Sequence, residues 1–600
     1  MGRVGAVLFP LGIVVLLAGC SGASSGVVNT PAVRVVVTPR SASVIVNQPL
    51  NFQAAVTGTT NTLVTWQVAG ITGGNSTVGT ITATGAYTAP AQVPNPASVA
   101  VTAVSQASPS VSGAASVIIA ASNVNEQPQN VPVELGTSGG NANDSSVQGK
   151  LIYCCSGTLG SLVERNGTFY ILSNNHVLAR SDSAQIGDAI IQPGLTDGNC
   201  SSTGTTTVGN LTQFVNLQAA GTNVDAAIAQ IVTGTVDTSG NILLLGRTAP
   251  GGTPDAGPPH AGNGISANMG ENVAKSGRTS GLTCSTVDAL DVTTSVSYQT
   301  GCSTGTTYSV TYTEQISVSG GNFSASGDSG SLLVDQNTAD PVALLYAGSD
   351  TDSVGNPVGD VLSALKDSEG HQPTFVGSAS PHAVAGCSIA ANVVKTTGAV
   401  VPALSAAQLA QAERARDIHA PELLSSAYIQ AIGVGQSIDH PGEPAVVLVV
   451  NPGQIPEALP DTLEGILTRI VPAGVAGAGP HGVFEMETAQ RIAPVVDTFA
   501  VQALSNQELA RAKAVHRAHV AELMKQPGVQ GVGITSSADA PGEAALMIFV
   551  VRGVPRNPIP VTIDGLRTRV RESSPFTAGQ RGAETMSGCK VPLTAIPVNP

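Results

Sequence analysis

Short stretches in which apolar and polar residues alternate dominate residues 33–121. Such alternation is typical of half-buried strands, and Gly, Asn, Thr and Pro residues separate the stretches as turns would. About seven strands are predicted, among them Val33–Pro39, Leu50–Val56 and Ala97–Ala103. Because the only tryptophan, Trp66, stands early in the middle of this series, the pattern predicts a β-sandwich whose core packs around its ring.

A second β-rich region, residues 135–395, carries three polar side chains at the ends of predicted strands. His176 follows one strand, Asp225 precedes an apolar stretch, and Ser329 stands in a Ser-Gly-Asp-Ser-Gly-Ser sequence before another. A serine hydroxyl is a poor nucleophile unless an imidazole removes its proton and a carboxylate orients that imidazole. The three side chains are therefore candidates for one nucleophilic site.

The last third of the chain is a duplication. Residues 402–475 match residues 502–575 at a constant offset of 100 positions, as in His419 and His519 or Asp439 and Asp539. In each copy Leu and Ala recur at helical spacing, and three strand-like stretches follow. In the first copy the stretches are Ile429–Val434, Ala445–Val450 and Leu467–Val471. Each copy is predicted to be a small α+β unit.

Composition excludes two classes of protein. With 42% hydrophobic residues the 600-residue chain can bury several cores, so wholesale disorder is excluded. The 26 Lys and Arg residues against 40 Asp and Glu residues give a net charge of −14, which disfavours binding to nucleic acid. Charged residues are denser beyond about residue 400, which predicts a domain boundary there. The predicted fold class is a mainly β multidomain protein that ends in the two α+β repeats.

The N-terminus has the pattern of a bacterial export signal. Arg3 supplies a positive charge, and the apolar segment Val7–Leu17 is too short to span a bilayer. The sequence Leu-Ala-Gly-Cys ending at Cys20 resembles the lipobox of bacterial lipoproteins. The resemblance implies a signal peptide over residues 1–20, a linker over residues 21–32 and acylation of Cys20. The protein would then be lipid-anchored in the bacterial cell envelope, on the periplasmic or surface face of the outer membrane. The alternative is an ordinary signal peptide with a chance cysteine.

Seven of the eight cysteines lie beyond the signal segment, and export to an oxidising compartment favours disulfides between them. Cys284 and Cys302 flank a predicted hairpin and are the first predicted pair. Cys200 with either Cys154 or Cys155 is the second. No Cys-x-x-Cys or His-spaced cluster occurs, so a structural zinc site is not predicted.

The order His176, Asp225, Ser329, with Gly-Asp-Ser-Gly around the serine, resembles the trypsin/chymotrypsin-like serine peptidases over residues 135–395. The Leu-Ser-Asn-Asn-His-Val-Leu sequence around the histidine is closer still to a bacterial branch related to the plant Narrow Leaf proteins. The resemblance implies a chymotrypsin-like double β-barrel and no cofactor. It makes Ser329 the nucleophile, His176 the general base and then acid, and Asp225 the orienting carboxylate.

The same resemblance assigns roles to the residues around the nucleophile. The backbone amides of Gly327 and Ser329 would form the oxyanion hole, and Asp328 is expected to make a structural ion pair or hydrogen bond. The substrate pocket is expected at Phe323 or its neighbours, with Gly348 on its wall to admit a side chain. No acid stands at the pocket position, which argues against a preference for Lys or Arg.

Residues 33–121 resemble bacterial immunoglobulin-like domains, which implies a stalk or an adhesion module. The strand portion of the repeats resembles a short Gly-Val-Gly module that accompanies Narrow Leaf-like peptidases. We expect the repeats to dock a protein partner or substrate, or to control the peptidase. His419 with Glu422, and His519 with Glu522, stand three residues apart on predicted helices. The first copy offers no third ligand, so a solvated helix face is favoured over a metal site.

The predicted function is an exported, lipid-anchored serine endopeptidase that acts on a peptide or protein substrate. The alternative is a non-catalytic cell-surface binding or adhesion protein that uses the peptidase barrel as a scaffold. An esterase with the same serine is less favoured, because α/β-hydrolases place serine, acid and histidine in a different chain order.

Overall fold

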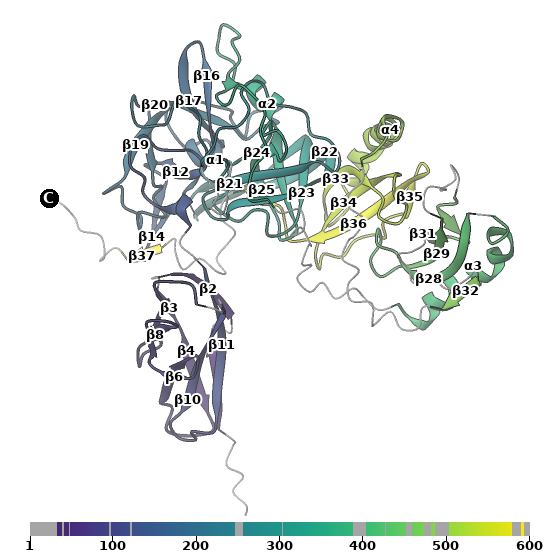
Figure 1. Ribbon diagram of the computed structural model, residues 1–600, viewed down its shortest axis with the longest axis horizontal. Helices are drawn as coiled ribbons and strands as arrows, with labels where there is room; N and C mark the ends of the chain where they lie inside the picture. Colours follow the sequence, from purple (N-terminus) through teal and green to yellow (C-terminus); the bar gives the residue numbers. More distant parts are fainter. Residues whose placement is uncertain are drawn as a thin grey trace, which may run out of the picture. The chain divides into compact units, whose positions relative to one another are not determined.

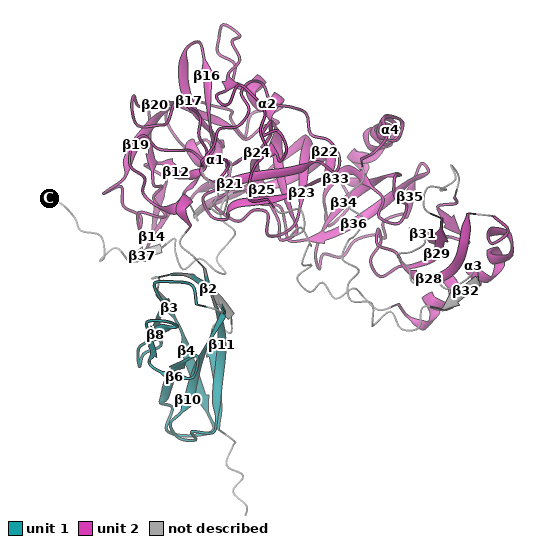
Figure 2. Ribbon diagram, in the orientation of Figure 1, with its two compact units in different colours: residues 1–122 teal, residues 123–600 magenta. Residues whose placement is uncertain are grey.

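The computed structural model describes residues 33–38, 41–46, 49–94, 96, 98–120, 123–149, 151–246, 256–302, 304–387, 404–426, 428–451, 459–472, 482–485, 503–578 and 590–592. Strands dominate these residues, which form 37 strands and four α-helices (Figure 1), so the predicted mainly β fold is confirmed. The chain divides into two compact units, residues 1–122 and 123–600 (Figure 2). None of the helices in the described ranges is long and apolar enough to span a bilayer. The predicted signal peptide and Cys20 lie outside the described residues.

Unit 1 is built from short strands around one core. They are β1 (Arg34–Thr38), β2 (Ser41–Ile45), β3 (Pro49–Asn51), β4 (Gln53–Thr57), β5 (Val64–Val68), β6 (Ile71–Thr72), β7 (Gly74–Asn75), β8 (Gly79–Ile81), β9 (Ala86–Thr88), β10 (Ser98–Ser105) and β11 (Ser112–Ala120). They form the sheets β2-β11-β10-β5-β6 and β3-β9-β8-β7 and the pair β1-β4. Trp66 is 5% exposed and its ring lies 6.3 Å from that of Phe52, as the predicted core requires. The sequence did not predict β11, because its Gly, Ala and Ser residues conceal the alternation.

The first part of unit 2 is an eight-stranded sheet in the order β15-β12-β18-β19-β20-β17-β16-β27. Its strands are β12 (Thr137–Asn141), β15 (Gly157–Leu159), β16 (Ser161–Arg165), β17 (Thr168–Ser173), β18 (Ala189–Gln192), β19 (Thr206–Phe214), β20 (Ala227–Ile231) and β27 (Thr374–Phe375). The short 3-10 helix η1 (Val124–Glu126) precedes the sheet, and α1 (Asn175–Leu178) follows β17. A separate sheet pairs β14 (Leu151–Cys154) with β13 (Ser145–Gln148) and β37 (Lys590–Pro592).

A ten-stranded sheet follows, in the order β21-β24-β25-β26-β23-β22-β33-β34-β36-β35. Its first six strands are β21 (Asn272–Gly277), β22 (Gly281–Gly301), β23 (Thr304–Ser319), β24 (Leu332–Asp335), β25 (Pro341–Gly348) and β26 (Asp352–Pro357). β21 also pairs with β22, so these six strands close into a ring. The helix α2 (Val358–Ala364) comes directly after β26 and packs against β25.

The predicted helix and three main strands of each repeat are confirmed. The first repeat contains α3 (Ala406–Leu423), β28 (Ile429–Gln436), β29 (Pro444–Val450), β30 (Thr462–Leu463), β31 (Ile466–Pro472) and β32 (Gly482–Glu485). The second contains α4 (Asn506–Leu523), β33 (Val529–Ser536), β34 (Ala544–Val551), β35 (Thr562–Ile563) and β36 (Leu566–Ser573). β33 pairs with β22, so the sheet of the second repeat continues that of the ring.

The two repeats contact each other through equivalent residues. Asp539 accepts a hydrogen bond from the backbone N–H of Ile438 at 2.8 Å, and Asp439 accepts one from the N–H of Ala538, also at 2.8 Å. The hydroxyls that donate to the same two carboxylates are those of Ser437 and Ser537. Because each bond recurs with the roles of the repeats exchanged, the repeats form a pseudo-symmetric pair, as two subunits of a twofold dimer do.

Three disulfides link parts of unit 2, namely Cys154–Cys200, Cys155–Cys302 and Cys284–Cys387. The predicted Cys284–Cys302 pair is wrong. Cys284 lies near the start of β22, which runs from Gly281 to Gly301, and Cys302 directly follows its end, so the two stand at opposite ends of one long strand. At roughly 3.3 Å per residue an extended strand keeps such residues tens of ångströms apart. The second prediction, Cys200 with either Cys154 or Cys155, is confirmed, and the partner is Cys154.

Candidate active site

His176 and Asp225 lie at the ends of two paired strands. His176 is on α1, directly after β17, and Asp225 precedes β20, which pairs with β17. This arrangement puts Nδ1 of His176 2.5 Å from Oδ2 of Asp225, and the backbone N–H of His176 donates to Oδ1 at 3.3 Å. Asp225 is fully buried. Two of the three predicted catalytic residues are thus directly hydrogen-bonded.

The imidazole of His176 has a defined tautomer. A carboxylate only accepts hydrogen bonds, so in the neutral ring Nδ1 carries the proton and donates a hydrogen bond to Asp225. Nε2 is then left as an acceptor. Nε2 is buried and has no hydrogen-bond partner among the described residues. A ring nitrogen in this state is available to take a proton from a nucleophile.

Three further groups hold Asp225 in place. The phenol of Tyr298, on β22, donates to Oδ2 at 3.0 Å. The backbone N–H of Asp225 donates to Oδ1 of Asn356 at 2.9 Å, and its carbonyl accepts from Nδ2 of Asn174 at 2.7 Å. Burial, and then the charge of Asp225, raise the pKa of Tyr298 well above its ordinary value, so the phenol stays protonated. Sequence reasoning missed Tyr298, because no motif marks a tyrosine within a long strand.

Ser329 lies on a loop that is fastened to the first sheet. The backbone N–H of Thr158, on β15, donates to the carbonyl of Ser329 at 2.9 Å, and its hydroxyl donates to the carbonyl of Gly327 at 3.0 Å. Gly330 has a φ of +95°, and a Cβ there would lie 2.1 Å from the hydroxyl of Ser173. Only glycine fits this position, so the second glycine of the Gly-Asp-Ser-Gly sequence lets the loop that carries Ser329 approach the strand that precedes His176.

The amides predicted to form the oxyanion hole are free to donate. In the described part of the chain, the N–H groups of Gly327 and Ser329 make no hydrogen bond. Their neighbours are engaged, since the N–H of Asp328 donates to Ala325 at 3.0 Å and that of Gly330 to Leu345 at 2.9 Å. The unpaired amides of a serine and of the residue two positions before it are the kind of donors that a developing oxyanion needs.

His176 and Ser329 line the same cleft, which has a volume of about 170 Å³. Asp144, Arg180 and Tyr298 line it as well. The structure therefore brings a half-buried serine, an imidazole with an unpaired nitrogen and two unpaired amides to one cavity. This arrangement has the parts needed for nucleophilic attack on a carbonyl group.

The expected structural role of Asp328 is confirmed. Its carboxylate lies 3.3 Å from Nζ of Lys275, and both side chains are fully buried. It also accepts hydrogen bonds from the backbone N–H of Thr279 at 2.8 Å and the hydroxyl of Ser280 at 2.6 Å. Burial alone would raise the pKa of Asp328, but Lys275 and these bonds outweigh it and lower the pKa. The ion pair ties the loop that carries Ser329 to β21 of the ring.

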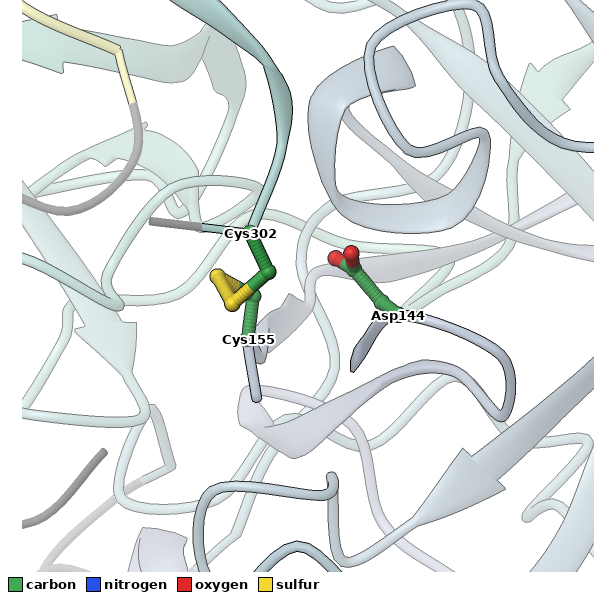
Figure 3. A group of neighbouring side chains, drawn as sticks. All are labelled: Asp144, Cys155 and Cys302. Atoms are coloured by element: carbon green, nitrogen blue, oxygen red, sulfur yellow. A yellow bond between two sulfur atoms is a disulfide. The ribbon is translucent and has the colours of Figure 1, made fainter. Parts of the chain in front are cut away.

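Asp144, Cys155 and Cys302 place three potential ligand atoms within 4.8 Å of one another beside the cleft (Figure 3). The two sulfurs are bonded to each other, so neither supplies the thiolate that metal binding needs. Burial raises the pKa of Asp144 to about 6, although the charges of Arg180 and His176 oppose this shift. Asp144 is thus a titratable group of the cleft that the sequence did not reveal.

The predicted pocket residues have different positions. Gly348 lines a small hollow next to Ser329, together with Ser324 and Leu345. Of the predicted position, Phe323 or its neighbours, Phe323 itself does not line the hollow, because its side chain is 3% exposed and packs in the interior of the ring. Phe323 closes a turn, its backbone N–H donating to the carbonyl of Gly320 at 3.0 Å, and the next residue, Ser324, lines the hollow.

The histidines of the repeats bond to acids other than those proposed as fellow ligands. Nε2 of His419 lies 3.2 Å from Glu464, and Nε2 of His519 lies 2.6 Å from Asp564, the equivalent position. Glu522 pairs instead with Lys525 at 2.8 Å. These contacts tie each helix to a turn of its own repeat.

No protein-family model and no curated protein matches the chain. Among solved structures it is similar to the N-terminal eight Ig domains of Down Syndrome Cell Adhesion Molecule (DSCAM) isoform 1.30.30, with 11% identity, a TM-score of 0.12, and coverage of 48% of this chain and 52% of that one. It is also similar to the N-terminal four Ig domains of Dscam1 isoform 9.44, with 9% identity, a TM-score of 0.12, and coverage of 50% and 72%. The chain spans about half the length of the first of these. At such TM-scores the similarity gives no information on fold or function.

Proposed function

We propose that this chain is a serine endopeptidase of the trypsin/chymotrypsin-like type. The observation that carries the proposal is the 2.5 Å contact between His176 Nδ1 and Asp225 Oδ2, with Ser329 lining the same cleft as the imidazole. The unpaired amides of Gly327 and Ser329 support it, because acyl transfer needs donors next to the nucleophile.

The proposed reaction has two steps. Oγ of Ser329 attacks the carbonyl carbon of the scissile peptide bond while Nε2 of His176 takes the hydroxyl proton. The negative oxygen accepts hydrogen bonds from the amides of Gly327 and Ser329. In enzymes of this kind each such donor stabilises the transition state by about 3 kcal/mol. His176 then gives its proton to the leaving amine, which leaves an acyl group on Ser329. Water, deprotonated by His176, hydrolyses this ester and restores the serine.

The arrangement of the strands supports the finer fold assignment. The ring of β21 to β26 fits one barrel of the double-barrel fold, and the eight-stranded sheet fits the other. The site residues come from both, with His176 and Asp225 at the eight-stranded sheet and Ser329 before β24 of the ring. Unit 1, with its sheets around Trp66, fits an immunoglobulin-like stalk.

We further propose that the protein is exported and held in the bacterial cell envelope by a lipid on Cys20. The three disulfides of the second unit support an oxidising compartment, since cytosolic proteins rarely keep such bonds. A peptide or protein is the proposed substrate, and a protein partner is proposed for the C-terminal repeats.

A fluorophosphonate probe, which forms a covalent bond with an activated serine, tests the proposal. The full-length protein should be labelled, and mass spectrometry of its peptides should locate the adduct on Ser329. Ser329→Ala should abolish labelling, whereas Ser202→Ala, which changes an exposed serine elsewhere, should not. Cleavage of a peptide library should depend on Ser329 in the same way. A folded protein that is neither labelled nor active would favour the non-catalytic binding protein instead.

A further inference from the structure

A segment of the second repeat enters the candidate active site. Ser574–Ala578 directly follows β36, the last main strand of that repeat. Thr577 lines the cleft that contains His176 and Ser329, and it also lines the small hollow beside Gly348. The chain thus places one of its own residues next to the proposed nucleophile.

The segment binds through its backbone, as an added strand does. The N–H of Thr577 donates to the carbonyl of Gly348 at 3.2 Å, and the N–H of Gly348 donates back to Thr577 at 3.2 Å. On the other side, the N–H of Ala578 donates to Ser297 at 3.1 Å and the N–H of Ser297 to Phe576 at 3.2 Å. The segment therefore fills a gap between Gly348, at the end of β25, and Ser297, on β22. Backbone pairing of this kind accepts extended peptides of many sequences.

Contacts with the second repeat, and one with Asp350 between β25 and β26, hold the segment in the gap. The side chain of Phe576 is 1% exposed, and its ring lies 5.5 Å from that of Phe549 on β34. The backbone N–H of Phe576 donates to Oε1 of Gln530 at 2.9 Å, and that of Ser574 donates to Asp350 at 2.7 Å. Phe576 is thus anchored to the second repeat by Phe549 and Gln530, and Thr577 and Ala578, which follow it, lie in the gap.

We propose that the gap between Ser297 and Gly348 is the peptide-binding edge of the active site, and that Ser574–Ala578 is a tethered occupant that excludes peptide substrates. This inference rests on the proposed function. A tethered segment acts at an effective concentration of about millimolar, so an extended peptide binds only when the segment leaves. The second repeat thereby becomes the element that restrains the peptidase.

Binding of a peptide to a variant that lacks Ser329 tests whether Ser574–Ala578 occupies the gap. The full chain with Ser329→Ala is titrated with a fluorescein-labelled synthetic copy of residues 572–578. Adding Thr577→Pro, which removes the N–H that donates to Gly348, should lower the Kd of this peptide by about tenfold or more, because the competitor is weakened. Gln530→Ala removes the hydrogen bond to the backbone N–H of Phe576 but leaves the segment's sequence intact, and it should also lower the Kd of the peptide. Thr577→Ala keeps both backbone bonds and should leave the Kd near that of the Ser329→Ala parent.

Amide hydrogen exchange gives a second readout in the same proteins. The N–H groups of Gly348 and Ser297 should exchange faster in the Thr577→Pro chain than in the Thr577→Ala chain. Unchanged exchange and an unchanged Kd in both the Thr577→Pro and the Gln530→Ala chains, with folding intact by circular dichroism, would overturn the proposed occupancy.

Activity separates this inference from the proposed function. With Ser329 present, Thr577→Pro should raise kcat/KM for peptides by about tenfold, mainly through a lower KM, since the competitor is removed. If the chain binds peptide more tightly after Thr577→Pro but is never labelled by fluorophosphonate, the occupancy holds and the peptidase assignment fails. If it is labelled and active with equal kcat/KM in both forms, the peptidase stands and the restraint is wrong.

Discussion

The phenol of Tyr298 donates a hydrogen bond to the carboxylate of Asp225 at 3.0 Å, on the same oxygen that His176 contacts. The hydroxyl of Tyr312 lies 2.7 Å from that of Tyr298. Because the single proton of Tyr298 goes to Asp225, Tyr298 accepts from Tyr312. A buried chain of two phenols thus supports the same carboxylate oxygen that the imidazole contacts, and the ring of Tyr298 lies 6.0 Å from that of His176. In the proposed peptidase this support fixes the orientation of His176.

Tyr298→Phe should lower kcat/KM for peptides by about tenfold to a hundredfold, because a hydrogen bond to a charged group contributes roughly 1.5–3 kcal/mol. The rate of labelling by a fluorophosphonate should fall in parallel. Tyr312→Phe is the matched control, since it keeps the bond to Asp225 and should cost much less. Equal losses in the two variants would show that packing of the rings, and not the bond to Asp225, matters.

Lys275→Met should destabilise the ring and the loop that carries Ser329 together. It leaves the carboxylate of Asp328 buried without its cation, a change that typically costs about 3–5 kcal/mol. Thermal unfolding should therefore begin at a lower temperature, and labelling of Ser329 should weaken. Combining Lys275→Met with Asp328→Asn removes both charges and should restore part of the lost stability. A single variant as stable as the parent would contradict the role given to this ion pair.

Asp144→Asn should stabilise the protein more at pH 8 than at pH 4. Burial raises the pKa of Asp144 from 3.8 to about 6, so the folded chain binds more protons than the unfolded chain between these values. Stability contributed by this group is then present at low pH and is lost as the pH rises toward 6 and above. Two pKa units correspond to about 3 kcal/mol at most. The difference in Tm between variant and parent, measured across this range, checks the sign. A difference that is constant with pH would contradict it.

The parts of the site that the sequence predicted are those that local patterns mark. His176 follows a strand and Ser329 stands in a Gly-Asp-Ser-Gly sequence, and both positions are set by a few neighbouring residues. Tyr298 reaches Asp225 across 73 residues, and its position depends on how two long strands pair. Thr577 reaches Gly348 only because the second repeat extends the sheet of the ring.

In the repeats, too, the sequence predicted local elements but not the contacts between distant parts of the chain. The spacing of their apolar residues predicted the helix and main strands of each copy, and the constant offset predicted that the two copies share them. The offset did not predict that the copies would exchange contacts through Asp439 and Asp539. Such a contact depends on the shape of two folded surfaces, which no alternation of apolar and polar residues records.

Disulfide mapping separates the pairing in the structure from the pairing first expected. In the structure Cys302 is bonded to Cys155 and Cys284 to Cys387. Cys302→Ser should therefore free the thiol of Cys155 and leave Cys284 oxidised, and alkylation of the unfolded, unreduced protein followed by peptide mass spectrometry should find the label on Cys155. Cys387→Ser should free Cys284 and lower stability by about 2–5 kcal/mol, because this bond closes a long loop. A label on Cys284 in the Cys302→Ser chain would restore the hairpin pairing, and β22 could then not run as one strand.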